Sequence, residues 1–160
     1  MAILSTLCYI EQGENWLMLH RTKKKNDINS GKWIGVGGKF EEGESPEECL
    51  LREIAEETGI VPTSYTFRGI VTFVSDCAPN EYMHLFTATC PQNVRLRECD
   101  EGELAWVPRS EVLQRPLWPG DRIFLQLLQQ REIPFFSLKL CYCGEKVVRA
   151  VLNGEETAVE

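Results

Sequence analysis

The stretch 38–60 constrains the fold of this chain more than any other, because it marks both ends of one helix. Ser45 is a residue type that caps helix N-termini, Pro46 suits the first helical position, and Glu48 completes a capping box with Ser45. Gly59 readily adopts the left-handed conformation that ends many helices. The sequence therefore predicts a helix between Ser45 and Gly59.

This helix has two faces of different chemistry. The apolar residues at helical spacing form the face that we expect to be buried: Leu50, Leu51, Ile54 and Ala55. Glu53, Glu56 and Glu57 are spaced i, i+3 and i+4, so their carboxylates gather on a second face and repel one another. Such hard oxygen ligands suit Mg²⁺ or Mn²⁺, with water and substrate phosphates completing the shell. The alternative is an acidic face that only contacts solvent.

The same stretch resembles the Nudix box of the Nudix hydrolase family, written Gly-x5-Glu-x7-Arg-Glu-U-x-Glu-Glu-x-Gly-U with U aliphatic. All nine fixed positions are filled, by Gly38, Glu44, Arg52, Glu53, Ile54, Glu56, Glu57, Gly59 and Ile60. A match of this length and spacing is a strong signal. The resemblance implies an α/β fold, the Nudix α/β/α sandwich, in which a mixed β-sheet lies between helices and the box forms a loop–helix–loop.

Shorter matches outside the box resemble the MutT-type members that hydrolyse oxidised purine nucleoside triphosphates, the animal enzymes in particular. They are Trp33 with its neighbouring glycines, His84-Leu85-Phe86, Trp106, Trp118-Pro119 and Asp121. The resemblance implies a Mg²⁺-dependent enzyme that cleaves a nucleoside triphosphate, such as 8-oxo-dGTP, to the monophosphate and pyrophosphate. Its partner is then a small-molecule nucleotide, and its role is sanitation of the nucleotide pool.

The resemblance also implies a role for each residue of the site. The expected ligands of Mg²⁺, or of Mn²⁺ in its place, are the Gly37 carbonyl, Glu53, Glu56, Glu57 and Glu101. Glu53 is the expected base or water-orienting residue, and Arg52 and Glu57 complete the catalytic set. Arg52 is expected to pair with Glu44 and so to hold the helix beside its loop. Gly38, Glu44 and Gly59 are structural positions of the box.

One metal ligand is ambiguous in the sequence. Glu101 lies in a charged loop before an expected strand, and Asp100 and Glu103 are rivals for its place. A loop that is simply solvated is the alternative for all three acids. The sequence does not decide among them, nor does it give the number of metal ions.

Four residues are candidates for substrate binding. Arg21 resembles a basic residue that contacts substrate phosphates in related hydrolases, and Lys39 either reaches a phosphate or is simply exposed. Trp118 either stacks on a purine or belongs to the core. Asp121 either hydrogen-bonds the edge of the base or stabilises the N-terminus of a helix.

The chain departs from the animal enzymes at positions that contact the base. Ile34 stands where those enzymes have a base-reading Asn, and Gly120 replaces the first of two pocket acids. Thr72 and Val74 fall where aromatic residues line their pocket. The hydrolase class is therefore better supported than the substrate.

Strand patterns along the rest of the chain agree with an α/β domain over residues 1–160. Strands are expected over 2–10, 16–20, 64–75, 81–90 and 104–107, with a closing hairpin of 134–140 and 146–152. A helical turn is expected over 109–114 and a second helix from Pro119. Residues 153–160 are expected to be frayed.

Composition narrows the partners and the compartment. The net charge of −7 argues against duplex nucleic acid and against an anionic membrane. The seven cysteines are scattered and odd in number, and residues 1–10 show no secretory signal, so we expect reduced thiols and a cytoplasmic location. The oligomeric state is left open.

Three function classes remain in competition. The first is a metal-dependent nucleoside triphosphate pyrophosphohydrolase. The second is a hydrolase of another nucleoside diphosphate derivative, such as a dinucleoside polyphosphate or a nucleotide sugar. The third is a nucleotide-sensing module without catalysis. The intact set of box acids favours an enzyme, because a sensor does not need them.

Overall fold

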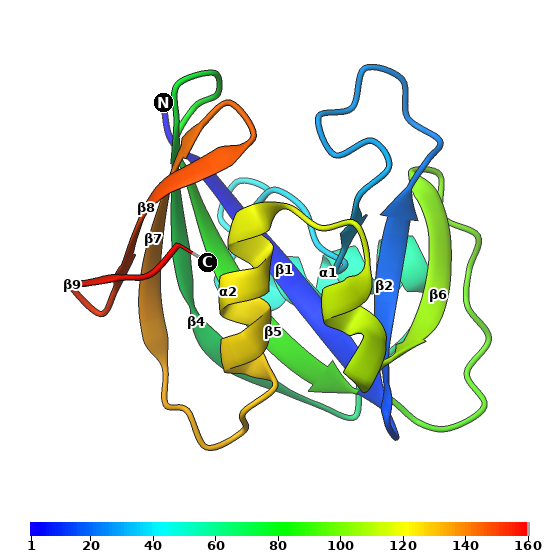
Figure 1. The fold of residues 1–160 in the computed structure, drawn as a ribbon. Helices are drawn as coiled ribbons and strands as arrows, with labels where there is room; N and C mark the ends of the chain where they lie inside the picture. Colours follow the sequence, from blue (N-terminus) through cyan, green and yellow to red (C-terminus); the bar gives the residue numbers. More distant parts are fainter. Residues whose placement is uncertain (160) are drawn as a thin grey trace.

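The computed structural model describes residues 1–159 and builds them into one sheet with two principal helices (Figure 1). The strands are β1 (Ile3–Gln12), β2 (Asn15–Arg21), β3 (Trp33–Ile34), β4 (Ser64–Ser75), β5 (Glu81–Thr89), β6 (Gly102–Pro108), β7 (Phe136–Cys143), β8 (Lys146–Leu152) and β9 (Glu155–Thr157). The helices are α1 (Pro46–Thr58), the 3₁₀ helix η1 (Arg109–Gln114) and α2 (Pro119–Leu128). In residues 1–159, no helix is long and apolar enough to cross a membrane.

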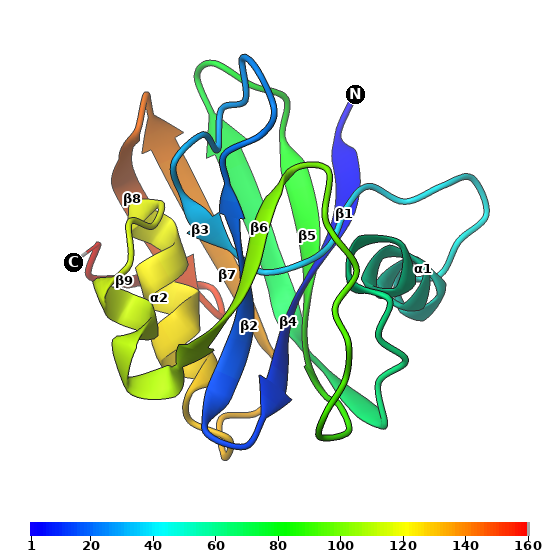
Figure 2. The ribbon, with the colours of Figure 1, turned by 90° about the vertical axis from the view of Figure 1, so that its right-hand side faces the viewer.

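The sheet is mixed, as expected. Its order is β3-β2-β1-β5-β4-β7-β8-β9, with β6 paired to β2 off this path. The pairs β1–β5 and β4–β7 are parallel, and the others are antiparallel. The helices α1 and α2 lie on opposite faces of the sheet (Figure 2). This arrangement confirms the predicted α/β sandwich.

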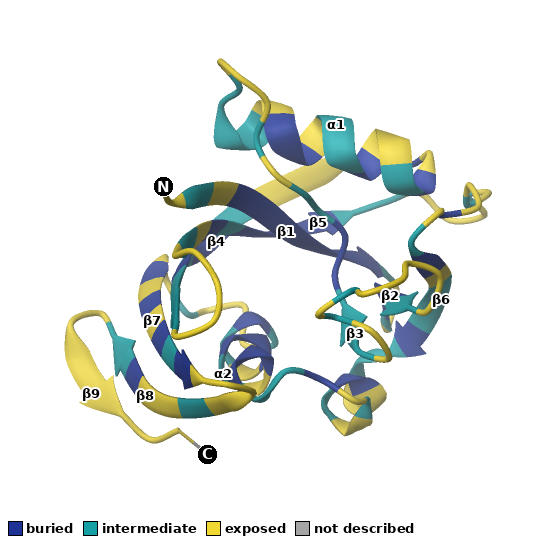
Figure 3. Ribbon diagram, turned by 90° about the horizontal axis from the view of Figure 1, so that it is seen from above, coloured by how far each residue is buried: buried dark blue, intermediate teal, exposed yellow. Residues whose placement is uncertain are grey.

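The two faces of the sheet carry separate hydrophobic cores, because side chains alternate between faces along each strand. On β1, Cys8 and Ile10 pack toward α1, where they meet Leu50 and Ile54. Tyr9, between them, packs on the other face with residues of α2. Figure 3 shows that β1 and β5 are buried for most of their length between the helices.

The buried face of α1 differs from the one that the sequence predicted. Leu50 and Ile54 are buried as expected, but Leu51 is 40% exposed and Ala55 is also exposed. Cys49 and Thr58 are buried instead. The reason is that Glu53 and Glu57, one turn apart, face the glycine-rich segment before the helix, and this orientation turns Leu51 and Ala55 outward.

The expectation of a frayed end is wrong for most of its length. Residues 155–157 form β9, which pairs antiparallel with β8 through a turn with Asn153 and Gly154 at positive φ. Asn153 also accepts a hydrogen bond from the Ser137 amide through its side chain. The turn signal of Asn153-Gly154 was therefore missed in the sequence. Residue 160, the last of the expected frayed segment, lies outside the described residues.

Candidate active site

The site begins where β2 turns away from β1 after their short hairpin contact. The segment 36–40 fills the edge of β1 that β2 leaves free. Cys8 and Val36 exchange two backbone hydrogen bonds, of 2.7 and 2.9 Å. The Thr6 amide donates to the Gly38 carbonyl at 2.9 Å. A Cβ on Gly37 would collide with the Thr6 carbonyl group, so only glycine allows this close approach.

The helix α1 starts and ends as its sequence predicts. The Ser45 hydroxyl accepts from the Glu48 amide at 3.1 Å, and the Glu48 carboxylate accepts from the Ser45 amide at 2.9 Å. Gly59 ends the helix with φ of 78°. These local devices fix the first and last turns of α1, and with them the direction in which its acids point.

Arg52 holds the acids of the box together. Its guanidinium donates two hydrogen bonds to the Glu44 carboxylate, of 2.6 and 2.9 Å. This contact lowers the pKa of the Glu44 carboxyl to about 2. Its Nη1 donates to Glu53 Oε1 at 2.8 Å and to Glu56 Oε2 at 3.2 Å. Its Nη2 also donates to the Lys39 carbonyl at 3.0 Å. The predicted pair of Arg52 and Glu44 is therefore present and extends to both the loop and the helix.

Glu53, Glu57 and Glu101 form an acidic cluster on the loop side of α1. Burial raises the pKa of Glu57 to about 8, against the lowering effect of the Gly37 amide, which donates to Glu57 Oε1 at 2.8 Å. Glu101 and Glu53 raise it further because their charges are alike. Burial also raises the pKa of Glu53, although Arg52 opposes the shift. Burial and like charge therefore both act against the ionised forms of Glu53 and Glu57.

The donor chemistry of this cluster fits a divalent cation. Among residues 1–159, no three acidic, thiol or imidazole side chains already converge on one cation position. The cluster nevertheless offers hard carboxylate oxygens beside the Gly37 backbone, and an added cation would relieve their mutual repulsion. Glu56 is the most exposed of the box acids, with 58% of its side chain accessible.

The structure separates Glu101 from its two rivals. Glu101 is half-buried and faces the cleft, whereas Asp100 and Glu103 are exposed. Arg21 donates to Glu101 at 2.9 Å and to Asp27 at 2.8 Å, and only 11% of its side chain is accessible. Arg21 therefore positions Glu101 in this structure. Lys39 is exposed at the rim of the cleft.

A cleft of about 880 Å³ connects the acidic cluster to a pocket at the start of α2. Some of its lining residues belong to the loops that join β2 to β3, β4 to β5 and β7 to β8, which lie at the top of Figure 1. Glu53 and Glu101 line one part of it, and Trp118, Asp121 and Tyr142 line another. The volume lies in the range of small-molecule sites.

Trp118 is held at the edge of this pocket rather than deep in the core. Its indole Nε1 donates to the Asn29 side-chain oxygen at 2.7 Å. The Lys32 ammonium lies 4.6 Å from the ring centroid, close enough for a cation–π contact. The ring also meets Tyr142 edge-on, with centroids 5.7 Å apart. Trp118 therefore both packs on the core and lines the cleft.

Asp121 is buried at the floor of the pocket, with 5% of its surface exposed. Burial raises its pKa to about 8, and the Lys32 charge offsets only part of the shift. The carboxyl thus holds a proton around neutral pH and can donate a hydrogen bond. No side-chain capping bond is present at the N-terminus of α2, so Asp121 does not cap this helix through its side chain.

The sequence missed three residues of the pocket. Asn29 and Tyr142 lie on other elements and carried no local signal. Phe73 also lines the cleft, together with Ser75, whereas Thr72 and Val74 do not. The alignment that placed Thr72 and Val74 in the pocket is therefore one residue out, since alternate residues of β4 face opposite sides. An aromatic side chain is present there after all.

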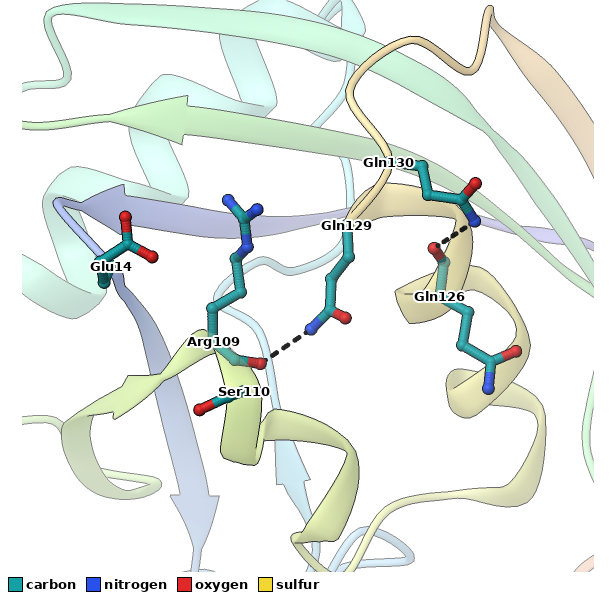
Figure 4. A pocket seen from close by; sticks show the side chains of 6 residues that line it. All are labelled: Glu14, Arg109, Ser110, Gln126, Gln129 and Gln130. Carbon is teal, nitrogen blue, oxygen red and sulfur yellow. Dashed lines mark hydrogen bonds between the residues drawn. The ribbon is translucent and has the colours of Figure 1, made fainter.

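A second hollow, of about 580 Å³, lies on another part of the surface (Figure 4). It is formed by side chains from the β1–β2 turn, η1 and α2: Glu14, Arg109, Ser110, Gln126, Gln129 and Gln130. Gln129 donates to the Arg109 carbonyl at 3.0 Å, and Gln130 donates to the Gln126 carbonyl at 3.2 Å. It shares no residue with the cleft and holds no cluster of acids.

The fold and the cleft define an α/β protein in which an acid-bearing helix, braced by one arginine, faces a pocket of nucleotide size. The chain belongs to the NUDIX domain family, whose model matches residues 1–128. This family consists of hydrolases that act on pyrophosphate bonds in small-molecule nucleotides and that generally use divalent metal ions.

Individual relatives are 26–30% identical to this chain over the residues that align. It is 30% identical over 129 residues to an uncharacterised Nudix hydrolase, YvcI, of Bacillus subtilis, covering 78% of each chain. It is 30% identical over 110 residues to the oxidized purine nucleoside triphosphate hydrolase of Mus musculus, covering 68% of this chain and 70% of that one. The crystal structure of a MutT protein of Bacillus halodurans superposes with a TM-score of 0.82 at 26% identity, over 96% of this chain and 99% of that one.

Proposed function

We propose that this Nudix hydrolase is a Mg²⁺-dependent pyrophosphohydrolase that converts a purine nucleoside triphosphate to the monophosphate and pyrophosphate. The observation that carries the proposal is the single cleft joining the braced acids to Trp118 and Asp121. One end offers carboxylates for a cation on the phosphates, and the other offers an aromatic ring and a buried carboxyl for a base. The similarity to the mouse enzyme adds oxidised purines, such as 8-oxo-dGTP, to the candidate substrates.

The proposed cation ligands are the Gly37 carbonyl, Glu53, Glu56, Glu57 and Glu101. When bound, Mg²⁺, or Mn²⁺ in its place, would neutralise charge on the phosphoryl oxygens and acidify water. Glu57 and Glu101 repel each other in the structure, and Arg21 already balances Glu101. The chain therefore supplies both the ligands and the groups that keep them in place.

Glu53 is the proposed base. Arg52 donates to its Oε1 atom at 2.8 Å, and the remaining lone pairs of the carboxylate would serve both the cation and the proton of the attacking water. Burial raises the pKa of this carboxyl and so strengthens it as a base. Arg52 takes no proton itself, and its contact with Glu44 fixes the position of Glu53 relative to the loop.

Lys39 and Arg21 are the proposed phosphate contacts. Lys39 is exposed at the rim, on the same segment that carries the Gly37 carbonyl, and makes no ion pair within residues 1–159. Arg21 donates to the carboxylates of Asp27 and Glu101 in the structure. To contact a phosphate as well, its guanidinium would have to give up one of these bonds or divide its donors between a carboxylate and the phosphate. Trp118 would stack on the purine, and protonated Asp121 would donate to its edge.

One panel of substrates tests the proposal. It contains 8-oxo-dGTP, dGTP, dCTP, a dinucleoside polyphosphate, a nucleotide sugar and ADP-ribose, each assayed with Mg²⁺ for all products. The expected result is release of pyrophosphate and a nucleoside monophosphate, with the highest kcat/KM on a purine triphosphate. Preference for a dinucleoside polyphosphate or a nucleotide sugar would replace this substrate, and binding without turnover of any compound would indicate a sensor.

A further inference from the structure

Tyr142 meets the N-terminus of α2 at the floor of the pocket. The Gly120 amide donates to the Tyr142 hydroxyl oxygen at 2.9 Å, and both residues are buried. A Cβ on Gly120 would lie 2.6 Å from that oxygen and 2.6 Å from Leu140 Cδ1. The tyrosine hydroxyl therefore fills the space that a side chain at position 120 would need. A side chain at position 120 and this hydroxyl would therefore exclude each other.

Tyr142 lines the cleft, and its hydroxyl still has a proton to donate. The oxygen accepts from Gly120, and among residues 1–159 the hydroxyl donates no hydrogen bond to another group. Phe73 and Trp118 pack against the tyrosine ring, with centroids 6.1 and 5.7 Å away, and so fix its orientation. A tyrosine hydroxyl can donate as well as accept, so this unused proton is available to an acceptor atom on a ligand in the cleft.

The protonation of the pocket floor also favours an acceptor on the ligand. Burial and the neighbouring Asp121 raise the pKa of Tyr142 well above its ordinary value, so the hydroxyl keeps its proton. Asp121 is itself protonated around neutral pH and adds a second donor. A carbonyl oxygen on the base matches two donors, whereas an amino group at the same place does not.

We propose that Tyr142 is a specificity-determining residue that donates its hydroxyl proton to the 6-carbonyl oxygen of a purine, so that 6-keto purines are preferred over 6-amino purines. This inference rests on the proposed purine nucleotide substrate. The alternative role for Tyr142 is structural, as the partner of an otherwise unsatisfied amide in the first turn of α2. Removal of the hydroxyl would then weaken all ligands equally.

Binding of product nucleotides tests this without any turnover. Calorimetry would measure the affinities of dGMP, 8-oxo-dGMP and dAMP for the wild type and for Tyr142→Phe. The matched control is Tyr65→Phe, because Tyr65 is exposed on β4 and does not line the cleft. We expect Tyr142→Phe to weaken the two 6-keto nucleotides about tenfold and dAMP less than about twofold, with no change in Tyr65→Phe.

Equal weakening of all three nucleotides, or a wild type that binds dAMP as well as dGMP or binds neither, would overturn the inference. A lower melting temperature of Tyr142→Phe is expected in either case, because Gly120 loses its partner, so the affinity ratio decides. A wild type that prefers dGMP but hydrolyses no triphosphate would refute the proposed function and leave this inference standing. Suppose instead that the protein hydrolyses purine triphosphates and that Tyr142→Phe leaves the ratio of dGMP affinity to dAMP affinity unchanged. This result would refute the inference and leave the proposed function standing.

Discussion

Two adjacent glycines of the active-site loop are expected to respond to the same substitution in opposite ways. A Cβ on Gly37 would meet backbone, the carbonyl group of Thr6, with 2.7 Å to its carbon. A Cβ on Gly38 would meet the end of a side chain, the carboxylate of Glu53, with 2.5 Å to its Cδ. Backbone in a sheet cannot yield easily, whereas a carboxylate can rotate away. Gly37→Ala should therefore damage stability, and Gly38→Ala should damage catalysis.

The magnitudes follow from these contacts. Ordinary carbon contacts lie near 3.5–4 Å, so Gly37→Ala must move the loop by about 1 Å. Loss of two of the backbone hydrogen bonds between the loop and β1, at roughly 0.5–1.5 kcal/mol each, would cost about 1–3 kcal/mol. Gly38→Ala loses at most the Arg52–Glu53 contact, about 1 kcal/mol at a partly exposed site. Displacing the base by about 1 Å should lower kcat roughly 100-fold.

Urea unfolding and steady-state release of pyrophosphate would measure both effects. In a Glu53→Gln background, Gly38→Ala should lower residual activity no further, because it acts through that carboxylate. The reasoning would fail if Gly38→Ala kept the wild-type kcat, or if it destabilised the protein as much as Gly37→Ala. An additional loss of activity in the Glu53→Gln background would show that Gly38 acts by another route.

Two further predictions concern Asp121. Burial raises its pKa from 3.8 to about 8, so between these values the folded state holds a proton that the unfolded state has lost, and wild-type stability should fall as pH rises. Asn cannot ionise, so the melting temperature of Asp121→Asn relative to wild type should climb across this window; a constant difference would contradict the assigned protonation. Asp121→Ala should lower kcat/KM more on 8-oxo-dGTP and dGTP than on dCTP, and an equal loss on all three would remove Asp121 from base recognition.

The parts of the site that the sequence predicted are those that depend on residues close to one another in the chain. Ser45, Glu48 and Gly59 act within a few residues of themselves, so the ends of α1 follow from chemistry that any such segment carries. The pairing of Arg52 with Glu44 and the choice of box acids followed from the family motif. The mixed sheet followed from the same resemblance and not from the strand patterns alone.

The parts that the sequence did not predict depend on which elements become neighbours. Tyr142 on β7 contacts Gly120 on α2, and nothing within either segment of the sequence indicates that contact. Phe73 was missed because a shift of one residue exchanges the two faces of a strand. The exposure of Leu51 depends on how α1 is rotated against the glycine loop, which a count of apolar residues cannot give.

The central claim is that Glu53 serves as the base in a cation-dependent hydrolysis. The most direct measurement is the rate of monophosphate and pyrophosphate formation from a purine triphosphate by wild type and Glu53→Gln, each with Mg²⁺ and with EDTA. We expect wild-type activity only with the cation. We expect Glu53→Gln to raise the activation barrier by several kcal/mol, at about 1.4 kcal/mol per factor of ten in rate. Unfolding curves should show that the variant stays folded. A comparable kcat for the two proteins, or full wild-type activity in EDTA, would contradict the account.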